Sequence, residues 1–305
     1  MFLHMKRKQM TGDADLDREA PAFAADANPE AEFSAKASWS GQEPVLMDTH
    51  VHTQHSDGAA TIQQVEEACR RLNVGCCIAD HNEIRGSIHL WERRQVPTLT
   101  SMEVGSRELI ELIVFFDNPE SCEQFFKENV EPYRLKRWYT FLPRSLEALM
   151  AGAHEHGALI SLPHPYAWLW KNIRFGERRQ GRVERVLEEI EGIEVLNGSM
   201  SPRANRRAWQ LCSQLAKTPL AGSDAHLVEA IGSVLVGLEA PGFSASLFDQ
   251  LKAGRVFGLF AFEPWSLPLA SGWQMVRQHT RKLISLPVSF KPTAGRRMGW
   301  PSFLK

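Results

Sequence analysis

Short apolar runs alternate with amphipathic stretches from Val45 to about Phe260. The apolar runs have the length of strands and read VLMDTH, CCIADH, TLTSMEV, LIELIVFF, ALISLPHP, IEVLNG and PLAGSDAH. The stretches with helical periodicity are TIQQVEEACRRLNVG, SLEALMAGAHEHG, RVERVLEEIEG, SPRANRRAWQLCSQLAK and ASLFDQLKAG. Strands that alternate with helices of this length predict parallel βα units, and therefore an α/β fold.

The first of these helices carries its own start and stop signals. Thr61 and Gln64 have the spacing of a capping box, and Gly75 is expected at the end of the helix. One face is expected to be apolar, with Ile62, Val65, Cys69 and Leu72.

Both ends of the chain differ in composition from this central part. Residues 1–44 mix Ala, Asp, Glu and Pro without periodicity, which predicts a disordered N-terminal extension. Residues 261–305 are expected to form a basic C-terminal extension, because Lys and Arg recur from 271 to 305 without an acidic residue. This tail either contacts phosphate or nucleic acid or is a solvated terminus, and the second alternative is the more common. We therefore expect a barrel domain over residues 45–260.

Charge and cysteine usage narrow the class of protein. The chain of 305 residues has 23% charged residues and a formal net charge of -1, which does not suggest binding to nucleic acid through bulk charge. The 5 cysteines are odd in number and lack CxxC spacing, so we expect reduced core residues in a cytoplasmic protein. The start lacks the apolar region of a signal peptide, and no apolar run reaches the roughly 18 residues of a membrane span.

Polar residues of the kind that bind metals close several of the predicted strands, in DTHVH, ADHNE, SMEVG, LPHP, LNGS and GSDAH. In a parallel barrel the C-terminal ends of all strands meet on one face. A doubly wound sheet would bring together only the pair at its switch point. The placement therefore favours a barrel.

Strand alternation puts His50 and His52 on the same side of their strand, where both rings can reach one ion. An HxH pair alone is weak evidence. The set becomes specific when the other strand ends add His81, Glu103, His164, Asp224 and His226. Zn, Mn and Fe take imidazole and carboxylate ligands, so the pattern predicts a cluster of divalent metal ions.

With DTHVHTQHSDG, ADHNE, SMEVG, LPHP and GSDAH in this order, the chain resembles the PHP (polymerase and histidinol phosphatase) superfamily from about Val45 to Phe260. The resemblance implies a distorted (β/α)7 barrel that holds two or three ions of Mn, Zn or Fe and hydrolyses phosphoesters through a hydroxide that bridges two ions. It also implies three metal positions, whose ligands are His50, His52, Glu103 and Asp224 for the first, Glu103 and His164 for the second, and Asp57, His81 and His226 for the third.

One position departs from the family pattern. Where the family usually has a further histidine for the second metal, this sequence has Glu111. Glu111 either ligates the second metal, with an altered metal preference, or is a solvent-facing strand residue.

Three further residues are candidates for supporting roles. Asp48 is expected to orient a ligand imidazole. His55 either faces the substrate or protonates the leaving oxygen, and Arg203 either holds phosphate oxygens or lies on a solvated helix face. His154 and His156 are expected to cap a helix end.

The expected substrate is a small phosphate ester or a nucleotide. The alternatives are a nuclease whose strand is guided by the basic tail, and a catalytically weak binding protein on a PHP barrel.

Overall fold

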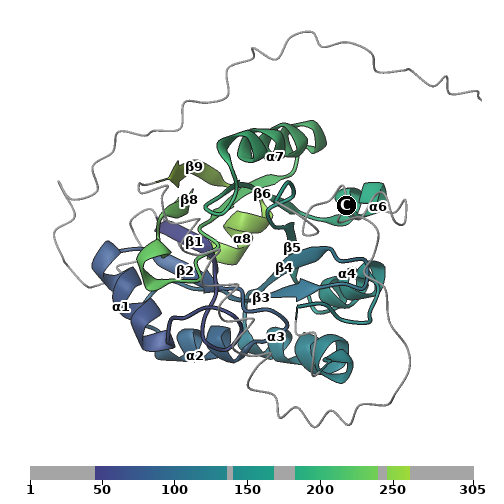
Figure 1. The fold of residues 1–305 in the computed structure, drawn as a ribbon, viewed down its shortest axis with the longest axis horizontal. Coiled ribbons are helices and arrows are strands. Elements are labelled where there is room, and N and C mark those ends of the chain that lie inside the picture. The colour runs from purple at the N-terminus through teal and green to yellow at the C-terminus, as the bar shows by residue number, and fades with distance from the viewer. Residues whose placement is uncertain (1–44, 136–139, 168–182, 240–245, 262–305) are drawn as a thin grey trace, which may run out of the picture.

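The computed structural model describes residues 45–135, 140–167, 183–239 and 246–261 (Figure 1). Residues 1–44 and 262–305, on which both predicted extensions depend, lie outside the described residues. The proposed limits of the central domain therefore stay predictions. The first described strand begins at Val45 and the last ends at Ala261.

The described strands form two sheets. The four-stranded sheet has the order β2-β1-β8-β9, and the five-stranded sheet has the order β3-β4-β5-β6-β7. The bounds of the first sheet are β1 Val45–Val51, β2 Gly75–Ile78, β8 Val234–Leu238 and β9 Val256–Ala261. Those of the second are β3 Thr100–Gly105, β4 Glu111–Phe116, β5 Leu159–Leu162, β6 Gly192–Asn197 and β7 Thr218–Gly222.

The expectation of parallel βα units is correct for only part of the molecule. β1 and β2 are parallel, as are β5, β6 and β7. β4 is antiparallel to both β3 and β5, and β8 is antiparallel to both β1 and β9. Only residues 106–110 connect β3 to β4, and a parallel crossover needs roughly a dozen residues or more, so this pair forms a hairpin.

The two sheets are joined at one end by two isolated parallel bridges, Val51 to Ala225 and His81 to Glu103. At these bridges the backbone N–H of His52 donates to the carbonyl of Ala225 at 2.9 Å, and that of Asn82 donates to the carbonyl of Glu103 at 2.8 Å. The fold is thus a mixed α/β arrangement of two linked sheets. The described strands do not form one closed sheet, so the predicted distorted (β/α)7 barrel is not confirmed.

Helices α1, α2, α3, α4 and α7 lie around the periphery of the strands (Figure 1). The bounds are α1 Ile62–Leu72, α2 Arg85–Arg93, α3 Pro119–Phe125, α4 Leu146–Glu155, α6 Val183–Glu189, α7 Pro202–Leu215 and α8 Leu247–Lys252. Shorter turns are a π-helix at Phe126–Val130 and 3-10 helices at Glu131–Tyr133 and Val228–Ala230. In the part of the chain that the structure describes, no helix has the length and apolarity needed to cross a bilayer.

The predicted start of α1 is confirmed. The side chains of Thr61 and Gln64 each accept from the other's backbone N–H, which is a capping box. The predicted stop is wrong by two residues: Asn73, with φ of 53°, adopts the left-handed conformation that ends the helix, and Gly75 begins β2.

β4 is buried on both sides, and its residues alternate between two apolar clusters. Leu112, Val114 and Phe116 pack in the cluster that includes α3 and α4. Ile113 and Phe115 pack in the other, which fills the space between the sheets with residues such as Met47, Leu196, Leu220 and Val236. All five cysteines are buried and unpaired, as their apolar surroundings predicted. The interior is thus filled with side chains below the end where the bridges lie.

Candidate metal centre

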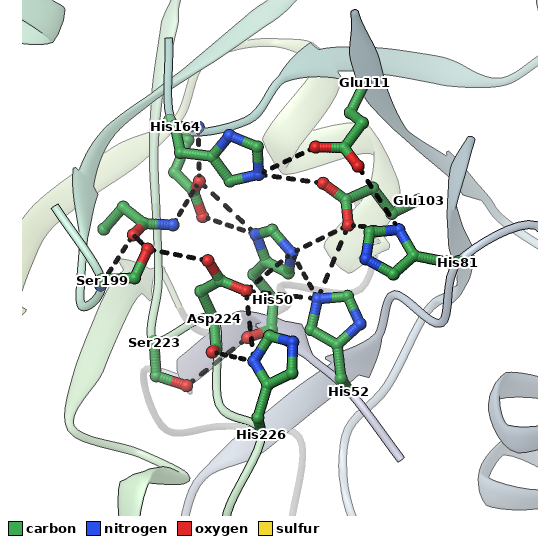
Figure 2. Close-up of polar contacts among 12 residues, drawn as sticks. His50, His52, His81, Glu103, Glu111, His164, Ser199, Ser223, Asp224 and His226 are labelled. Atoms are coloured by element: carbon green, nitrogen blue, oxygen red, sulfur yellow. Dashed lines mark hydrogen bonds and ion pairs between the residues drawn. The ribbon is translucent and has the colours of Figure 1, made fainter. Parts of the chain in front are cut away.

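The predicted ligands converge at the end of the sheets where the bridges join them, and Figure 2 shows them with the exception of Asp57. β1 and the loop after it supply three, and single ligands come from β3, from β4 and from the ends of β2 and β5. The segment after β7 supplies the last two. All are buried, with exposed fractions of 9% or less, for His50, His52, Asp57, His81, Glu103, Glu111, His164, Asp224 and His226.

The first metal position is bounded by four ligand atoms. His50 Nε2 and His52 Nε2 lie 3.0 Å apart. Asp224 Oδ1 lies 3.6 Å and 3.2 Å from these two nitrogens, and Glu103 Oε2 lies 3.7 Å and 3.5 Å from them. Ligands at about 2.1 Å from a tetrahedral ion are roughly 3.4 Å apart. The observed separations bracket that value, and His50, His52 and Asp224 form one of the groups that could hold an ion.

Glu103 also faces a second position through its other oxygen. His164 Nε2 lies 2.9 Å from Glu103 Oε1 and 3.7 Å from Glu111 Oε2. His81 Nδ1 lies 3.0 Å from Glu103 Oε2 and 3.6 Å from Glu111 Oε1. A carboxylate whose oxygens face two positions has the geometry of a bridging ligand.

The sequence allows Glu111 to be either a metal ligand or a solvent-facing strand residue. The structure places its side chain inside the cluster. It is only 2% exposed, and its carboxylate points at His81 and His164 (Figure 2). The solvent-facing alternative is therefore wrong.

The third position lies around Asp57. Asp57 Oδ2 is 3.5 Å from His81 Nε2 and 3.4 Å from His226 Nε2, and Asp57 Oδ1 is 3.5 Å from His52 Nδ1. The Nδ1–H of His226 donates to the backbone carbonyl of Asp224 at 2.9 Å. This bond directs His226 Nε2 toward Asp57.

The spacing and hydrogen bonding of several ligand atoms suit a bound metal ion better than direct contact with one another. His52 Nδ1 and His226 Nε2 are buried and make no hydrogen bond among the described residues. Buried polar atoms without partners are costly, and two imidazole nitrogens 3.0 Å apart need a cation or a proton between them. His164 and Asp224 also have positive φ values, 29° and 54°, a strained conformation that is typical of functional sites. The donor set therefore suits divalent ions.

The electrostatics of the cluster couple its acids and its imidazoles. Burial raises the pKa of Asp57, but His81 and His226 outweigh it and hold that pKa well below its usual range. In the same way the imidazoles around Glu103 and Asp224 hold both pKa values well below the usual range despite burial. The carboxylates are thus kept ionised, which is the form that binds metals.

The imidazoles respond in two different ways. Burial lowers the pKa of His50, but the charges of Glu194, Asp224 and Glu103 outweigh it and raise the pKa well above its usual value. For His52, burial and the neighbouring His226 lower the pKa to about 3. His52 is therefore a neutral ligand over the physiological range.

Two buried carboxylates behind the ligands were missed by sequence reasoning. Glu194, in β6, accepts from the ring of His50, and Asp80 accepts from the N–H and hydroxyl of Thr53 at 2.7 Å and 2.6 Å. Asp80 also accepts from the hydroxyl of Ser56 at 2.5 Å, and so holds the loop that carries Asp57. The sequence feature that could have identified them is a charged residue inside or at the end of an apolar run, because charged residues are seldom fully buried without a partner.

Asp48 has a supporting role that differs from the expected one. It accepts from the N–H and hydroxyl of Ser223 at 2.9 Å and 2.6 Å, and from the N–H of Gly232 at 2.9 Å. It therefore fixes the segment that precedes Asp224 rather than a ligand imidazole.

The two candidate catalytic residues, His55 and Arg203, make none of the contacts among the predicted metal ligands described above. His55 is half-buried, and its ring contacts His89 of α2 edge-on at 5.8 Å between centroids. Arg203 is exposed in the first turn of α7. Instead, Ser199 approaches the cluster, and its hydroxyl donates to Asp224 Oδ2 at 2.8 Å. The roles predicted for His55 and Arg203 stay predictions.

The contact of His156 Nδ1 with the carbonyl of Gly152, at 2.8 Å, fits the expected helix-end role.

Comparison with known proteins supports the fold. A family model described as PHP-associated matches residues 202–256. No curated protein matches the chain. Among solved structures, PsfC from Pseudomonas syringae PB-5123 is similar with a TM-score of 0.53 and 17% identity, over 79% of this chain and 99% of PsfC.

Two further solved structures have the same fold at low identity. One is a two-domain protein from Bacteroides vulgatus ATCC 8482, described as containing a predicted PHP-like metal-dependent phosphoesterase, with a TM-score of 0.52, 16% identity and coverage of 80% of this chain and 71% of that chain. The other is the lesion-specific endonuclease PfuEndoQ from Pyrococcus furiosus, with a TM-score of 0.54, 16% identity and coverage of 72% of this chain and 57% of the endonuclease.

Proposed function

We propose that this chain is a metal-dependent phosphoesterase that acts on a small phosphate ester or a nucleotide, a proposal supported by the PHP-associated family model and by the similarity in fold to a PHP-like protein. The observation that supports this most directly is the buried cluster, in which ligand atoms from both sheets bound adjacent positions for divalent ions. We also propose that the two sheets, joined by their bridges, are a distorted form of the (β/α)7 barrel.

In this proposal the first ion is held by His50, His52, Asp224 and Glu103, with ligand separations of 3.0–3.7 Å. Glu103, His164 and Glu111 would hold a second ion, and Asp57, His81 and His226 would hold a third. When bound, ions such as Mn, Zn or Fe lower the pKa of water and neutralise charge on phosphoryl oxygens.

The residues around the ions supply positioning. Arg203 follows the loop in which Ser199 contacts Asp224, and we propose that its guanidinium binds the phosphate of the substrate. His55 lies in the same loop as Asp57 and is proposed to protonate the leaving oxygen.

The test combines metal analysis with turnover. We expect the purified protein to retain divalent metal and to hydrolyse at least one member of a panel of sugar phosphates, histidinol phosphate, nucleoside mono- and bisphosphates and an aryl phosphate, with added Mn, Zn or Fe. His52→Ala should lose both metal and turnover. His154→Ala is the matched control, because His154 pairs with Glu191 at a helix end. Bound metal with no turnover on the whole panel would instead favour a binding protein.

A nuclease is the second candidate, favoured by the similarity in fold to PfuEndoQ. A related solved structure holds Endonuclease Q with a 27-mer duplex substrate that has an abasic lesion at the active site. Cleavage of oligonucleotides by this chain should fall steeply with salt and on removal of residues 271–305. Equal cleavage at low and high salt would exclude this candidate.

A further inference from the structure

β6 contributes a buried carboxylate, Glu194, which is only 1% exposed and lies beside the first metal position. It belongs to none of the candidate groups of metal ligands. Its contacts with two of those ligands suggest what it does.

One oxygen of Glu194 fixes the ring of His50. Glu194 Oε1 lies 3.1 Å from His50 Nδ1. A carboxylate can only accept, so the proton of this bond belongs to Nδ1. When the ring is neutral, the lone pair of His50 is then on Nε2, which is the nitrogen that faces His52, Asp224 and Glu103.

The other oxygen fixes the backbone of a ligand at the second position. Glu194 Oε2 accepts from the backbone N–H of His164 at 2.8 Å and from Asn197 Nδ2 at 2.8 Å. His164 has a φ of 29°, which is uncommon for a residue with a side chain. The bond therefore stabilises a strained backbone that places His164 Nε2 at 2.9 Å from Glu103 Oε1.

Close packing keeps this arrangement in place. A Cβ atom at Gly222 would lie 2.7 Å from Glu194 Oε1 and 2.9 Å from the backbone nitrogen of His50. Only glycine at this position allows β7 to approach His50 and Glu194 so closely.

We propose that Glu194 is a positioning residue that sets the ring of His50 and the backbone of His164 for two adjacent metal positions. This inference rests on the metal site of the proposed function, but not on any substrate. Partners that orient ligating histidines in this way typically contribute a factor of about 10–100 in metal affinity.

The test compares Glu194→Gln with Glu191→Gln. Glu191 is a matched control, because it also accepts from a backbone N–H, that of Ile160 at 2.8 Å, and contacts a histidine, His154 at 3.2 Å. Glu191 directly precedes Gly192, the first residue of β6, whereas Glu194 lies within the strand. Affinity for Mn and Zn is measured by competition with a chromophoric chelator, in the absence of substrate.

We expect Glu194→Gln to weaken binding by about 10–100-fold and Glu191→Gln to leave it within about twofold. Unchanged affinity in Glu194→Gln, or an equal loss in both variants, would overturn the inference. Because no ester is added, these results are independent of whether the protein hydrolyses phosphoesters.

If Glu194→Gln does not fold, NMR of the unchanged protein with 15N-labelled histidine replaces it. The His50 ring, assigned by the loss of its signal in His50→Gln, should carry its proton on Nδ1. A proton on Nε2 of the metal-free ring, with Nδ1 unprotonated, would overturn the inference.

Discussion

At the scale of single residues, Glu111 would give the proposed second metal position a carboxylate where the PHP superfamily usually has an imidazole. We expect Glu111→Gln to weaken metal binding, and to weaken Mn more than Zn, because carboxylate oxygens suit Mn whereas imidazole suits Zn. Chelator competition with each ion measures this. Glu123→Gln is the control. The Glu123 side chain lies on α3 and pairs with Lys127, so this change should have no effect on metal binding. Equal affinities of Glu111→Gln and the unchanged protein for both ions would contradict the assignment.

Asp80 supports the site through the loop that carries Asp57. Replacement by Asn would turn an amide N–H₂ toward the donors of Thr53 and Ser56, which now bond the carboxylate. We expect Asp80→Asn to lower the free energy of unfolding by about 1–3 kcal/mol, the cost of unsatisfied buried donors. Urea unfolding measures the change. The exposed Asp117→Asn should leave stability within about 0.5 kcal/mol, and a similar result for Asp80→Asn would show that the loop does not depend on it.

Which site residues a sequence can predict depends on where they lie. His50 and His52 were predictable because strand alternation fixes their relation, and the 3.0 Å between their Nε2 atoms agrees. Glu194 and Asp80 were not, because a residue that acts through a partner distant in sequence has no spacing signal of its own. Glu194 is 144 positions from His50, and they meet because β7 pairs with β6 and also lies beside β1.

At the scale of elements, α7 ends on a residue that is poorly suited to its conformation. Ala216 closes the helix with φ of 51° and ψ of 42°, which side chains other than glycine adopt at a cost. We expect Ala216→Gly to raise the free energy of unfolding by about 1 kcal/mol. Gln210→Gly, on the exposed face within the same helix, should lower it by about 1 kcal/mol. Chemical denaturation distinguishes the two, and a loss in both variants would contradict the strain at Ala216.

The elements were predictable where the signal is local and not where it is long-range. Thr61 and Gln64 lie three residues apart and predicted the start of α1 correctly. The direction of β4 was missed, although the short connection of residues 106–110 already indicated a hairpin. β8 and β9 were missed as strands. β8 is antiparallel to β9, and its antiparallel pairing with β1 depends on contacts across most of the chain.

At the scale of the whole molecule, the metal centre lies at the junction of the two sheets. His50, His52 and His81 come from the four-stranded sheet, and Glu103, Glu111 and His164 come from the five-stranded one. Bound ions would therefore connect the sheets beyond the two bridges at their ends. Ions that bind only the folded protein, at a concentration 100 times the dissociation constant, add about 2.7 kcal/mol to the free energy of unfolding.

We therefore expect a chelator to lower the Tm by roughly 5–10 °C, and Mn or Zn to restore it, because about 1 kcal/mol corresponds to a few degrees in a domain of this size. Calorimetry with and without chelator measures the shift. In His52→Ala the first position lacks a ligand, so the chelator should have a smaller effect. A Tm that does not respond to chelator or to added metal would mean that the two sheets are held by their bridges and packing alone, and that the cluster binds no ion tightly.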